Sequence, residues 1–374
     1  MADRRRQTGS GRRRRRRTYS AAEIRRNRAI LRLILMSMLF ILVCLGVWLL
    51  ANAYAKSRSE TVLSVDSSSY SVLADLPSES EAAQIEKEQQ IEEENSIFEQ
   101  KDSYPLEMII ESPYCVVYDV QGKQVLYAKD AWERCYPAST TKIITAAVML
   151  KYTDEDTIFT AGDEQSLVNE GSSLAYLNVG SVLDRSMILD AIMLPSGNDA
   201  SYCAAAVTGR IIAENDELTA QEAVDVFIEQ MNEFASDSGC TDTNFTCPDG
   251  FHDDNHYTTA MDMLRMTLHS EEYPEIAESG EKTYAEVDFL SGEHIWWSNS
   301  NSLIQSDNSN YYMYATGLKT GMTDQSGYCV VATAERFGHE IIIVCMGSET
   351  SEVRWNDTIA LFDAAFQYVR NSDA

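Results

Sequence analysis

The chain has 374 residues, of which 44% are hydrophobic, so it can bury one sizeable core and is long enough for two domains. Its formal net charge of −28 is unevenly distributed: the first 32 residues hold 13 arginines and two acidic residues, whereas the remainder carries 17 basic and 56 acidic residues. No cysteines or histidines have the spacing of a zinc module, which excludes a small zinc-binding protein.

Residues 33–51 form an uncharged apolar run of 19 residues, about 28 Å long as a helix, which matches the hydrocarbon thickness of a bilayer. Small residues at 51–53 and 53–55 resemble signal-peptide cleavage sites, but the apolar run is longer than usual for a cleaved signal peptide. We therefore favour a retained, single-pass signal-anchor at residues 33–52 over a cleaved one. Arginines concentrate on the cytoplasmic side of a span, so residues 1–32 are predicted to be a cytoplasmic tail and the rest to lie outside the cell membrane. This orientation also accounts for the Arg12 to Arg17 block, so no nucleic-acid partner is expected.

Residues 53–104 are rich in serine, glutamate and glutamine and contain few large apolar residues. They can bury little surface, and we predict that they form an acidic stalk. From residue 105 the composition becomes globular, and residues 105–374 are predicted to fold as one domain.

Within this domain the apolar residues recur at strand spacing near both ends and at helical spacing in between. The predicted elements are strands 114–119 and 124–128, helices 139–151, 182–194 and 224–236, strands 311–320, 328–334 and 340–346, and helix 352–370. Pro195 ends the second helix. Strands at both ends with helices between them indicate an α+β domain whose antiparallel sheet combines N-terminal and C-terminal strands.

Seven cysteines follow the predicted span, and because seven is odd at least one thiol must be free or pair with another chain. Cys240 and Cys247 are spaced for a disulfide across a short loop. The others in apolar runs are interpreted as core residues: Cys115, Cys203, Cys329 and Cys345. His252 and His256 lie in a loop, and neither a metal nor another cofactor is expected.

A serine and a lysine stand three residues apart where the first helix begins. One turn of helix places Ser139 and Lys142 on the same face. A serine hydroxyl becomes a good nucleophile when a neighbouring base takes its proton, and a lysine can do this when burial lowers its pKa. The N–H groups of a helix N-terminus can stabilise a developing oxyanion. The pattern predicts a nucleophile, Ser139, and its general base, Lys142.

The same spacing recurs at Ser279 and Lys282, among charged and glycine residues with no apolar helix behind them. Ser-x-x-Lys alone is therefore weak evidence. The first copy is favoured because residues 143–148 are almost entirely apolar and bury its helix.

Two further motifs support the first copy. Ser196 and Asn198 lie at a break between two apolar helices, where a hydroxyl can transfer a proton and an amide can hold substrate, although both residue types are also common helix caps. Lys319, Thr320 and Gly321 lie at the end of a predicted strand. The lysine and the hydroxyl can hold a carboxylate, and the glycine would let a substrate backbone lie close to the strand.

These three motifs, in this order and 57 and 123 residues apart, form the set found in penicillin-binding proteins and class A β-lactamases. From Tyr114 to Phe366 the sequence resembles the low-molecular-mass D-alanyl-D-alanine carboxypeptidases. The resemblance is carried by four runs: Tyr136 to Lys142, Leu194 to Ala200, Asn255 to Ala260, and Lys319 to Cys329.

The resemblance implies a β-lactamase/transpeptidase-like fold and an enzyme that removes the terminal D-alanine from peptidoglycan stem pentapeptides through an acyl-enzyme. It implies that β-lactam antibiotics bind at the same site. It also implies a proton relay through Ser196, substrate contacts from Asn198, Lys319, Thr320 and Gly321, and an oxyanion hole formed by the N–H groups of Ser139 and Met322. Arg354 resembles a family arginine near the substrate carboxylate.

Two alternatives remain at this point. A class A-like β-lactamase would take its second motif from Ser306 to Asn308, but that copy lies close to Lys319 in a polar turn, and no loop glutamate is placed to activate a deacylating water. The other alternative is a non-catalytic homologue that binds the cell wall. No Gly-x-Ser-x-Gly motif supports a Ser-His-Asp hydrolase.

Overall fold

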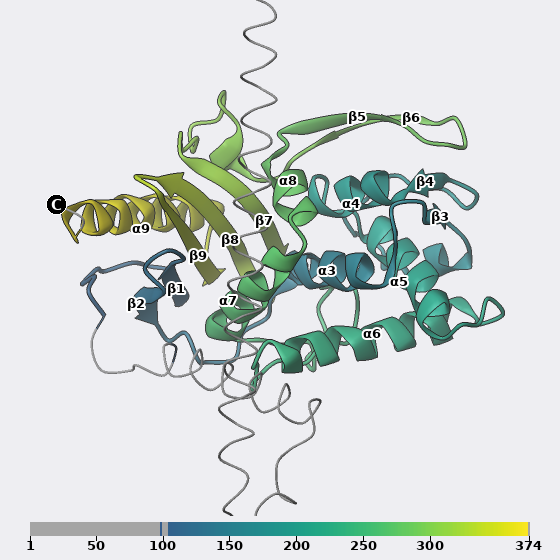
Figure 1. Ribbon diagram of the computed structural model, residues 1–374, viewed down its shortest axis with the longest axis horizontal. Coiled ribbons are helices and arrows are strands. Elements are labelled where there is room, and N and C mark those ends of the chain that lie inside the picture. Colours follow the sequence, from purple (N-terminus) through teal and green to yellow (C-terminus); the bar gives the residue numbers. More distant parts are fainter. Residues whose placement is uncertain (1–97, 99–103, 373–374) are drawn as a thin grey trace, which may run out of the picture. The chain divides into compact units, whose positions relative to one another are not determined.

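The computed structural model describes Phe98 and residues 104–372 (Figure 1). The predicted tail, the predicted span at 33–52 and almost all of the predicted stalk lie outside these residues. Within the part that is described, no helix is both long enough and apolar enough to cross a membrane. Phe98, from the segment predicted as a stalk, is buried and packs on Tyr118 with ring centroids 5.7 Å apart.

A five-stranded antiparallel sheet with the order β2-β1-β9-β8-β7 forms the centre of the domain. Its strands are β1 (Tyr114–Asp119), β2 (Gln124–Lys129), β7 (Ala315–Thr323), β8 (Gly327–Arg336) and β9 (His339–Ser348). The strands β1 and β9 pair, so the sheet joins the two ends of the domain as predicted. The middles of β8 and β9 are buried on both faces, which explains their continuous apolar runs.

Helix α9 (Ser351–Ser372) covers one face of the sheet (Figure 1). Trp355, Phe362 and Phe366 of this helix belong to the same buried cluster as Val117 of β1 and Ile343 of β9. The last helix and the first strand therefore share one core, which stabilises both ends of the domain together.

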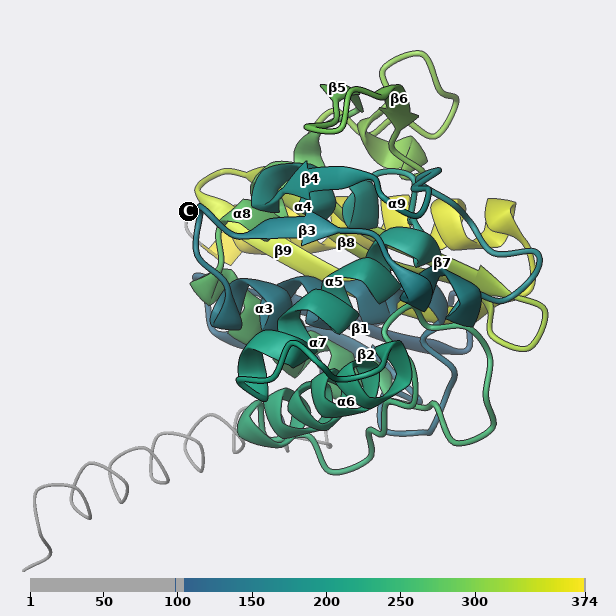
Figure 2. The same ribbon diagram turned by 90° about the vertical axis from the view of Figure 1, so that its right-hand side faces the viewer.

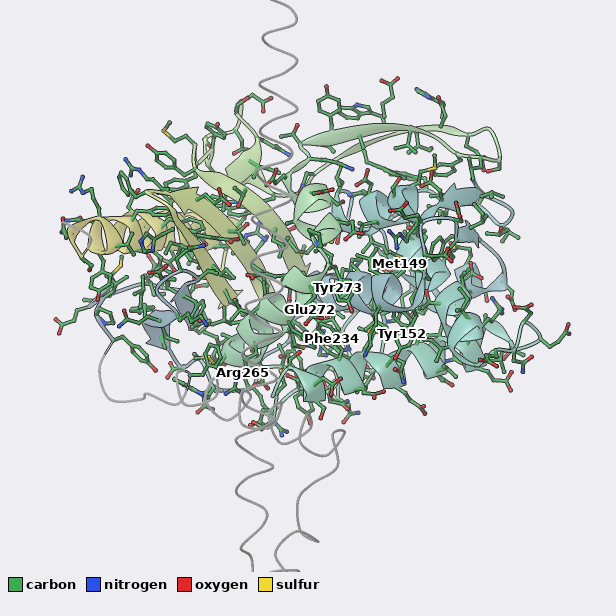
Figure 3. All side chains as sticks on the ribbon, viewed as in Figure 1. Met149, Tyr152, Phe234, Arg265, Glu272 and Tyr273 are labelled. Carbon is green, nitrogen blue, oxygen red and sulfur yellow. The ribbon has the colours of Figure 1, made fainter. Side chains whose placement is uncertain are left out.

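A group of helices lies against the other face (Figure 2). At its centre is α3 (Lys142–Tyr152), in which nine of the eleven residues are buried, as expected of a helix enclosed on all sides. Around it lie α5 (Asn198–Ile212), α6 (Ala220–Asp237) and α7 (Ala260–His269). Met149 of α3 and Phe234 of α6 are buried members of this core (Figure 3).

The remaining elements are short. They are η4 (Ala138–Thr141), β3 (Ile158–Thr160), η5 (Asp163–Leu167), β4 (Val182–Asp184), α4 (Arg185–Met193), η6 (Ser270–Glu272), α8 (Glu275–Glu281), β5 (Tyr284–Asp288), β6 (His294–Ser298) and η7 (Ser302–Ile304). The strands β3 and β4 pair with each other, as do β5 and β6.

Two predicted boundaries were wrong. Residues 182–184 form β4 instead of the start of a helix, because the Asp184 side chain accepts a hydrogen bond from the Met187 N–H and caps α4 at that point. The strand predicted at 311–320 begins only at Ala315. Tyr312 lies before it and donates from its hydroxyl to Asp363 of α9 at 3.0 Å.

The disulfide that the spacing of Cys240 and Cys247 allows is absent. All seven cysteines of the described region, Cys115 and Cys345 included, are free thiols in the structure, and the sulfurs of Cys240 and Cys247 do not contact each other. The Cys240 sulfur lies 3.4 Å from the Asp262 carbonyl oxygen on α7, and the Cys247 sulfur lies 3.5 Å from the Phe251 carbonyl oxygen. The loop between them places the two side chains against different neighbours. The four cysteines predicted as core residues are all buried.

Gly209 permits the close approach of α5 and α6, because a Cβ atom there would lie 1.9 Å from the Ala223 carbonyl oxygen. Replacing glycine by alanine normally stabilises a helix by about 1 kcal/mol, but this overlap outweighs that gain. We expect Gly209→Ala to lower the free energy of unfolding by roughly 1–3 kcal/mol, measured by urea denaturation. Ile211→Ala, at a 41% exposed position two residues further on, is the control. An unchanged or higher stability of Gly209→Ala would contradict the packing described.

Candidate active site

Ser139 and Lys142 lie at the junction of η4 and α3. The predicted continuous helix is a 3-10 turn over residues 138–141 that leads into α3 at Lys142. This arrangement keeps the two side chains on one face, and the Lys142 Nζ lies 3.0 Å from the Ser139 Oγ. The predicted pair is therefore within hydrogen-bond distance.

The Lys142 amine is fully buried and has two further partners. It donates to the Asn198 Oδ1 at 2.8 Å and to the Asp249 carbonyl oxygen at 2.7 Å. Burial is the main cause that lowers the pKa of Lys142, to about 8. When the amine is neutral, its two N–H groups can stay on these fixed acceptors, which leaves the lone pair facing the Ser139 hydroxyl.

The second motif lies in the bend between α4 and α5. Asn198 is the first residue of α5, and its Nδ2 donates to the Ser172 Oγ at 2.8 Å while its Oδ1 accepts from Lys142. Ser196 has a positive φ of 62°, and its buried hydroxyl has no hydrogen-bond partner among the described residues. An unpaired buried hydroxyl at a strained position is costly unless a bound ligand pairs with it.

Lys319 and Thr320 come from β7, the outer strand of the sheet at this end. Lys319 is 1% exposed, and its Nζ donates to the Thr320 carbonyl oxygen at 3.0 Å. Burial lowers the pKa of Lys319, and the nearby charges of Lys142 and Arg354 lower it further. The Thr320 Oγ1 lies 2.6 Å from the hydroxyl of Ser300, which is exposed.

Gly321 brings β7 against the turn that carries the serine. A Cβ atom at this position would lie 2.8 Å from the Ser139 backbone nitrogen and 3.0 Å from the Pro137 carbonyl oxygen. The absence of a side chain at Gly321 therefore makes room for the Ser139 turn. From the sequence we expected this glycine to make room for a substrate backbone instead. Met322, the next residue, has a 54% exposed side chain.

Arg354 lies behind β7 on α9. Its Nη1 is 3.2 Å from the Cys329 carbonyl oxygen and 3.5 Å from the Gly321 carbonyl oxygen, and its guanidinium lies over the Trp355 ring at 4.0 Å. Burial lowers its pKa to about 10. Arg354 thus holds the backbone of β7 and adds positive charge behind the lysine of that strand.

The loop after α6 supplies two contacts that sequence reasoning missed. The Asp249 carbonyl oxygen accepts from Lys142, and Gly250, at a positive φ of 78°, leaves no space for a Cβ atom, which would lie 1.9 Å from the Ala138 carbonyl oxygen. A backbone carbonyl has no residue-type signature, so the sequence offered no signal for the first contact, although the Pro-Asp-Gly sequence is typical of a turn.

His256 also escaped the sequence analysis as a support for the serine turn. Its Nε2 lies 2.9 Å from the Thr141 Oγ1, and its Nδ1 accepts from the Thr246 N–H at 3.0 Å. Burial lowers the pKa of His256 to about 3, so the ring is neutral and structural. Among the described residues, no group of three or more potential ligands is placed to hold a metal ion.

The competing motif copies lie elsewhere. The Ser279 hydroxyl donates to the Asp190 Oδ1 at 2.7 Å, and Lys282 forms an ion pair with the same carboxylate at 2.8 Å, so this lysine is not available as a base. Ser306 and Asp307 are exposed in the polar turn before β7.

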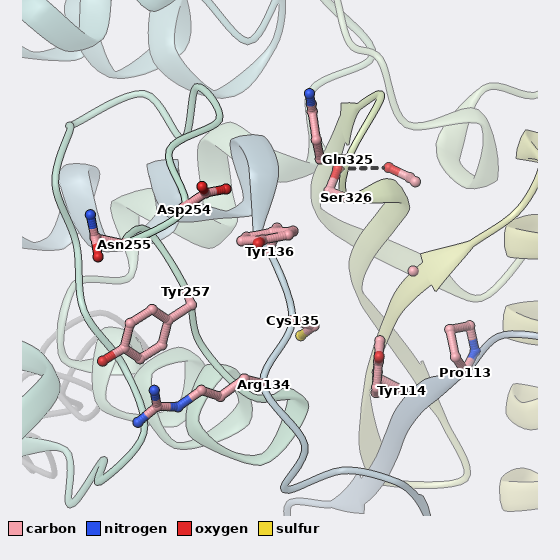
Figure 4. A pocket seen from close by; sticks show the side chains of 12 residues that line it. Pro113, Tyr114, Arg134, Cys135, Tyr136, Asp254, Asn255, Tyr257, Gln325 and Ser326 are labelled. Carbon is pink, nitrogen blue, oxygen red and sulfur yellow. Dashed lines mark hydrogen bonds between the residues drawn. The ribbon is translucent and has the colours of Figure 1, made fainter.

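A polar pocket lies beside the serine turn (Figure 4). Tyr136, three residues before Ser139, lines it together with Gln325 and Ser326 from the turn after β7. The side chains of Ser139, Lys142 and Asn198 are joined by hydrogen bonds, and Lys319 lies close enough to Lys142 for its pKa to be affected by that charge. Together they present a hydroxyl, a buried amine, an amide and a second buried amine, which is the set needed for acyl transfer to a serine.

Comparisons with known proteins agree with this geometry. The family model described as D-alanyl-D-alanine carboxypeptidase matches residues 99–350. The chain is 29% identical to D-alanyl-D-alanine carboxypeptidase DacF of Bacillus subtilis, over 70% of this chain and 63% of that protein. It is 28% identical to DacC of Escherichia coli, over 71% and 65%. The chain therefore spans a little less than two thirds of the length of these two relatives.

Among solved structures, the crystal structure of the Streptomyces K15 DD-transpeptidase matches with a TM-score of 0.63 and 26% identity. The match covers 70% of this chain and 99% of the Streptomyces chain. The matched segment of the family model contains Ser139, Lys142, Ser196, Asn198 and the Lys319 to Gly321 motif. From the match over residues 99–350, the chain belongs to the D-alanyl-D-alanine carboxypeptidase family.

Proposed function

We propose that the chain is a serine D-alanyl-D-alanine carboxypeptidase that trims the terminal D-alanine from peptidoglycan stem pentapeptides. The observation that carries the proposal is the buried Lys142 amine, 3.0 Å from the Ser139 Oγ and fixed by Asn198 and the Asp249 carbonyl. A neutral amine in this position can take the serine proton at neutral to mildly basic pH. Membership of the carboxypeptidase family supports the choice of substrate.

In the proposed reaction the Ser139 Oγ attacks the carbonyl carbon of the penultimate D-alanine, and its proton passes to the Lys142 Nζ. The oxyanion is held by the N–H groups of Ser139 and Met322. The contact of Gly321, the residue before Met322, with the Ser139 backbone nitrogen supports this pairing. The C–N bond then breaks as the Ser196 hydroxyl gives its proton to the departing amine and receives one from Lys142. Water finally hydrolyses the acyl-enzyme.

The free carboxylate of the substrate is proposed to bind at Lys319 and Thr320, with Arg354 adding positive charge from behind β7. The chain after residue 32 carries a formal charge of about −39, which repels an anionic peptide at long range. A local cationic site is therefore needed. Arg354, whose pKa of about 10 keeps it charged at neutral pH, supplies this charge from behind β7, and a bound carboxylate would favour the protonated form of Lys319. Both groups are buried, so their fields are weakly screened.

β-Lactam antibiotics are proposed to acylate the same serine, because the strained lactam amide presents the same carbonyl to the nucleophile. In wild-type protein we expect penicillin to label Ser139 and not Ser279. Lys142→Ala should slow labelling by roughly 10² to 10⁴-fold, and the wild-type rate should rise with pH up to about 8 as Lys142 becomes neutral. Peptide mapping by mass spectrometry identifies the labelled serine. A time course with samples quenched at intervals gives the rate of labelling.

Lys151→Ala is the matched control, since Lys151 lies in the same helix and is exposed. It should label at the wild-type rate. A label on Ser279, or normal labelling of Lys142→Ala, would remove this pair from the mechanism.

Carboxylate recognition predicts that the enzyme releases D-alanine from a free-acid pentapeptide much faster than from its C-terminal amide. Thr320→Ala should reduce this preference by about 10- to 100-fold, the worth of one hydrogen bond to a charged group. Thr316→Ala, on the same strand but hydrogen-bonded to Thr333, should keep the preference. Equal turnover of acid and amide by the wild-type enzyme would show that this site does not select a free carboxylate.

We propose that residues 33–52 anchor the chain in the cell membrane with the catalytic domain outside. The uncharged apolar run and the arginines that precede it support this orientation. The full chain should remain in the membrane pellet after an alkaline carbonate wash, and protease added to protoplasts should digest the catalytic domain. Recovery in the soluble fraction, or complete protection from the protease, would contradict the proposed anchor or its orientation.

A further inference from the structure

Two cysteines face each other across the junction of the two ends of the domain. Cys115 of β1 and Cys345 of β9 are directly opposed in the antiparallel register. Their sulfur atoms are 3.0 Å apart although the residues are 230 positions apart in the chain. A disulfide bond has a sulfur–sulfur distance of about 2.05 Å, so the two atoms need to approach by only about 1 Å.

Four other cysteine sulfurs of the described region contact different groups. The Cys135 sulfur lies 3.3 Å from the Met346 sulfur, and the Cys329 sulfur lies 3.6 Å from the Tyr136 carbonyl oxygen. Cys240 and Cys247 contact carbonyl oxygens, as described above. Cys115 and Cys345 are both fully buried between the sheet and α9, with Trp355 and Phe362 in the same cluster. Geometry thus singles out one pair.

We propose that Cys115 and Cys345 form a cross-strand disulfide that covalently joins the neighbouring strands β1 and β9, the first and the last strand along the chain. A small-molecule or protein disulfide is the oxidant. One cysteine thiolate attacks a sulfur of the oxidant and releases one thiol, and the second thiolate then attacks the resulting mixed disulfide and releases the other. Two electrons pass to the oxidant, and the two cysteine protons end on the two released thiols.

This bond would form while β1 meets β9 during folding. In the finished fold, burial and then the hydrogen bond with Cys345 raise the pKa of Cys115, so little thiolate is present to react. The same burial would protect the completed bond from reductants. The inference goes beyond the proposed activity and needs only that the chain meets a thiol oxidant, which its proposed position outside the membrane provides.

The test uses the full chain in detergent, refolded with oxidised and reduced glutathione. After refolding, free thiols are blocked in denaturant with iodoacetamide and the protein is digested with trypsin. Cleavage after Lys101, Lys123, Arg336 and Arg354 yields one peptide of residues 102–123 and one of residues 337–354, each with a single cysteine. We expect these two peptides to be linked in wild type and unlinked in Cys115→Ser. Alkylation of both cysteines, or linkage of either to a different cysteine, would overturn the proposal.

Thermal unfolding gives a second measurement that is independent of catalysis. Wild type refolded in dithiothreitol should melt roughly 5–10 °C below the oxidised protein. The double variant Cys115→Ala, Cys345→Ala should show no such difference, whereas Cys203→Ala, a buried cysteine on α5, should keep it. A reductant effect that persists in the double variant would assign the stabilisation to another pair. Penicillin labelling of the same samples reports separately on the proposed activity.

Discussion

The burial of the Lys142 amine is the constraint on which the candidate site depends. Burial of an ammonium group is costly. At Lys142 burial lowers the pKa and so shifts the protonation equilibrium toward the neutral amine, which can remain in the protein interior. The amine is tolerated in the protein interior because Asn198 and the Asp249 carbonyl accept its N–H groups. Three distant segments, α3, α5 and the loop after α6, must therefore pack correctly before the serine has a base.

The sequence predicted the parts of this site that residue types can signal. Ser139, Lys142, Asn198, Lys319 and Thr320 carry side-chain chemistry at fixed spacing, and the structure brings them into one region. The Asp249 carbonyl gave no such signal because it is a backbone group. The Ser300 hydroxyl gave none because its position in the site depends on its contact with the Thr320 hydroxyl, which only the folded chain brings about. Contacts between residues about 100 positions apart depend on topology, which periodicity alone does not determine.

The fold was predictable for similar reasons. The hairpin, the central helix and the three C-terminal strands have strong apolar patterns, and their bounds agree within a few residues. The errors arose where a local side-chain contact decided the boundary, as at Asp184, or where spacing was taken as proximity, as for Cys240 and Cys247. Cysteine pairing is set by strand register, and register is a property of the assembled sheet.

The two glycines that enclose the serine turn limit how this protein can evolve. Gly250 lies against the Ala138 carbonyl and Gly321 lies against the Ser139 nitrogen, so that neither position has space for a Cβ atom. Any side chain at either position displaces the nucleophile for every acyl donor alike. Under the proposed function, in which antibiotic and natural substrate acylate the same serine, substitutions at these two positions cannot separate the one from the other. Discrimination has to arise at neighbours with free space, such as the half-exposed Met322, where a new side chain can meet one acyl donor and not the other.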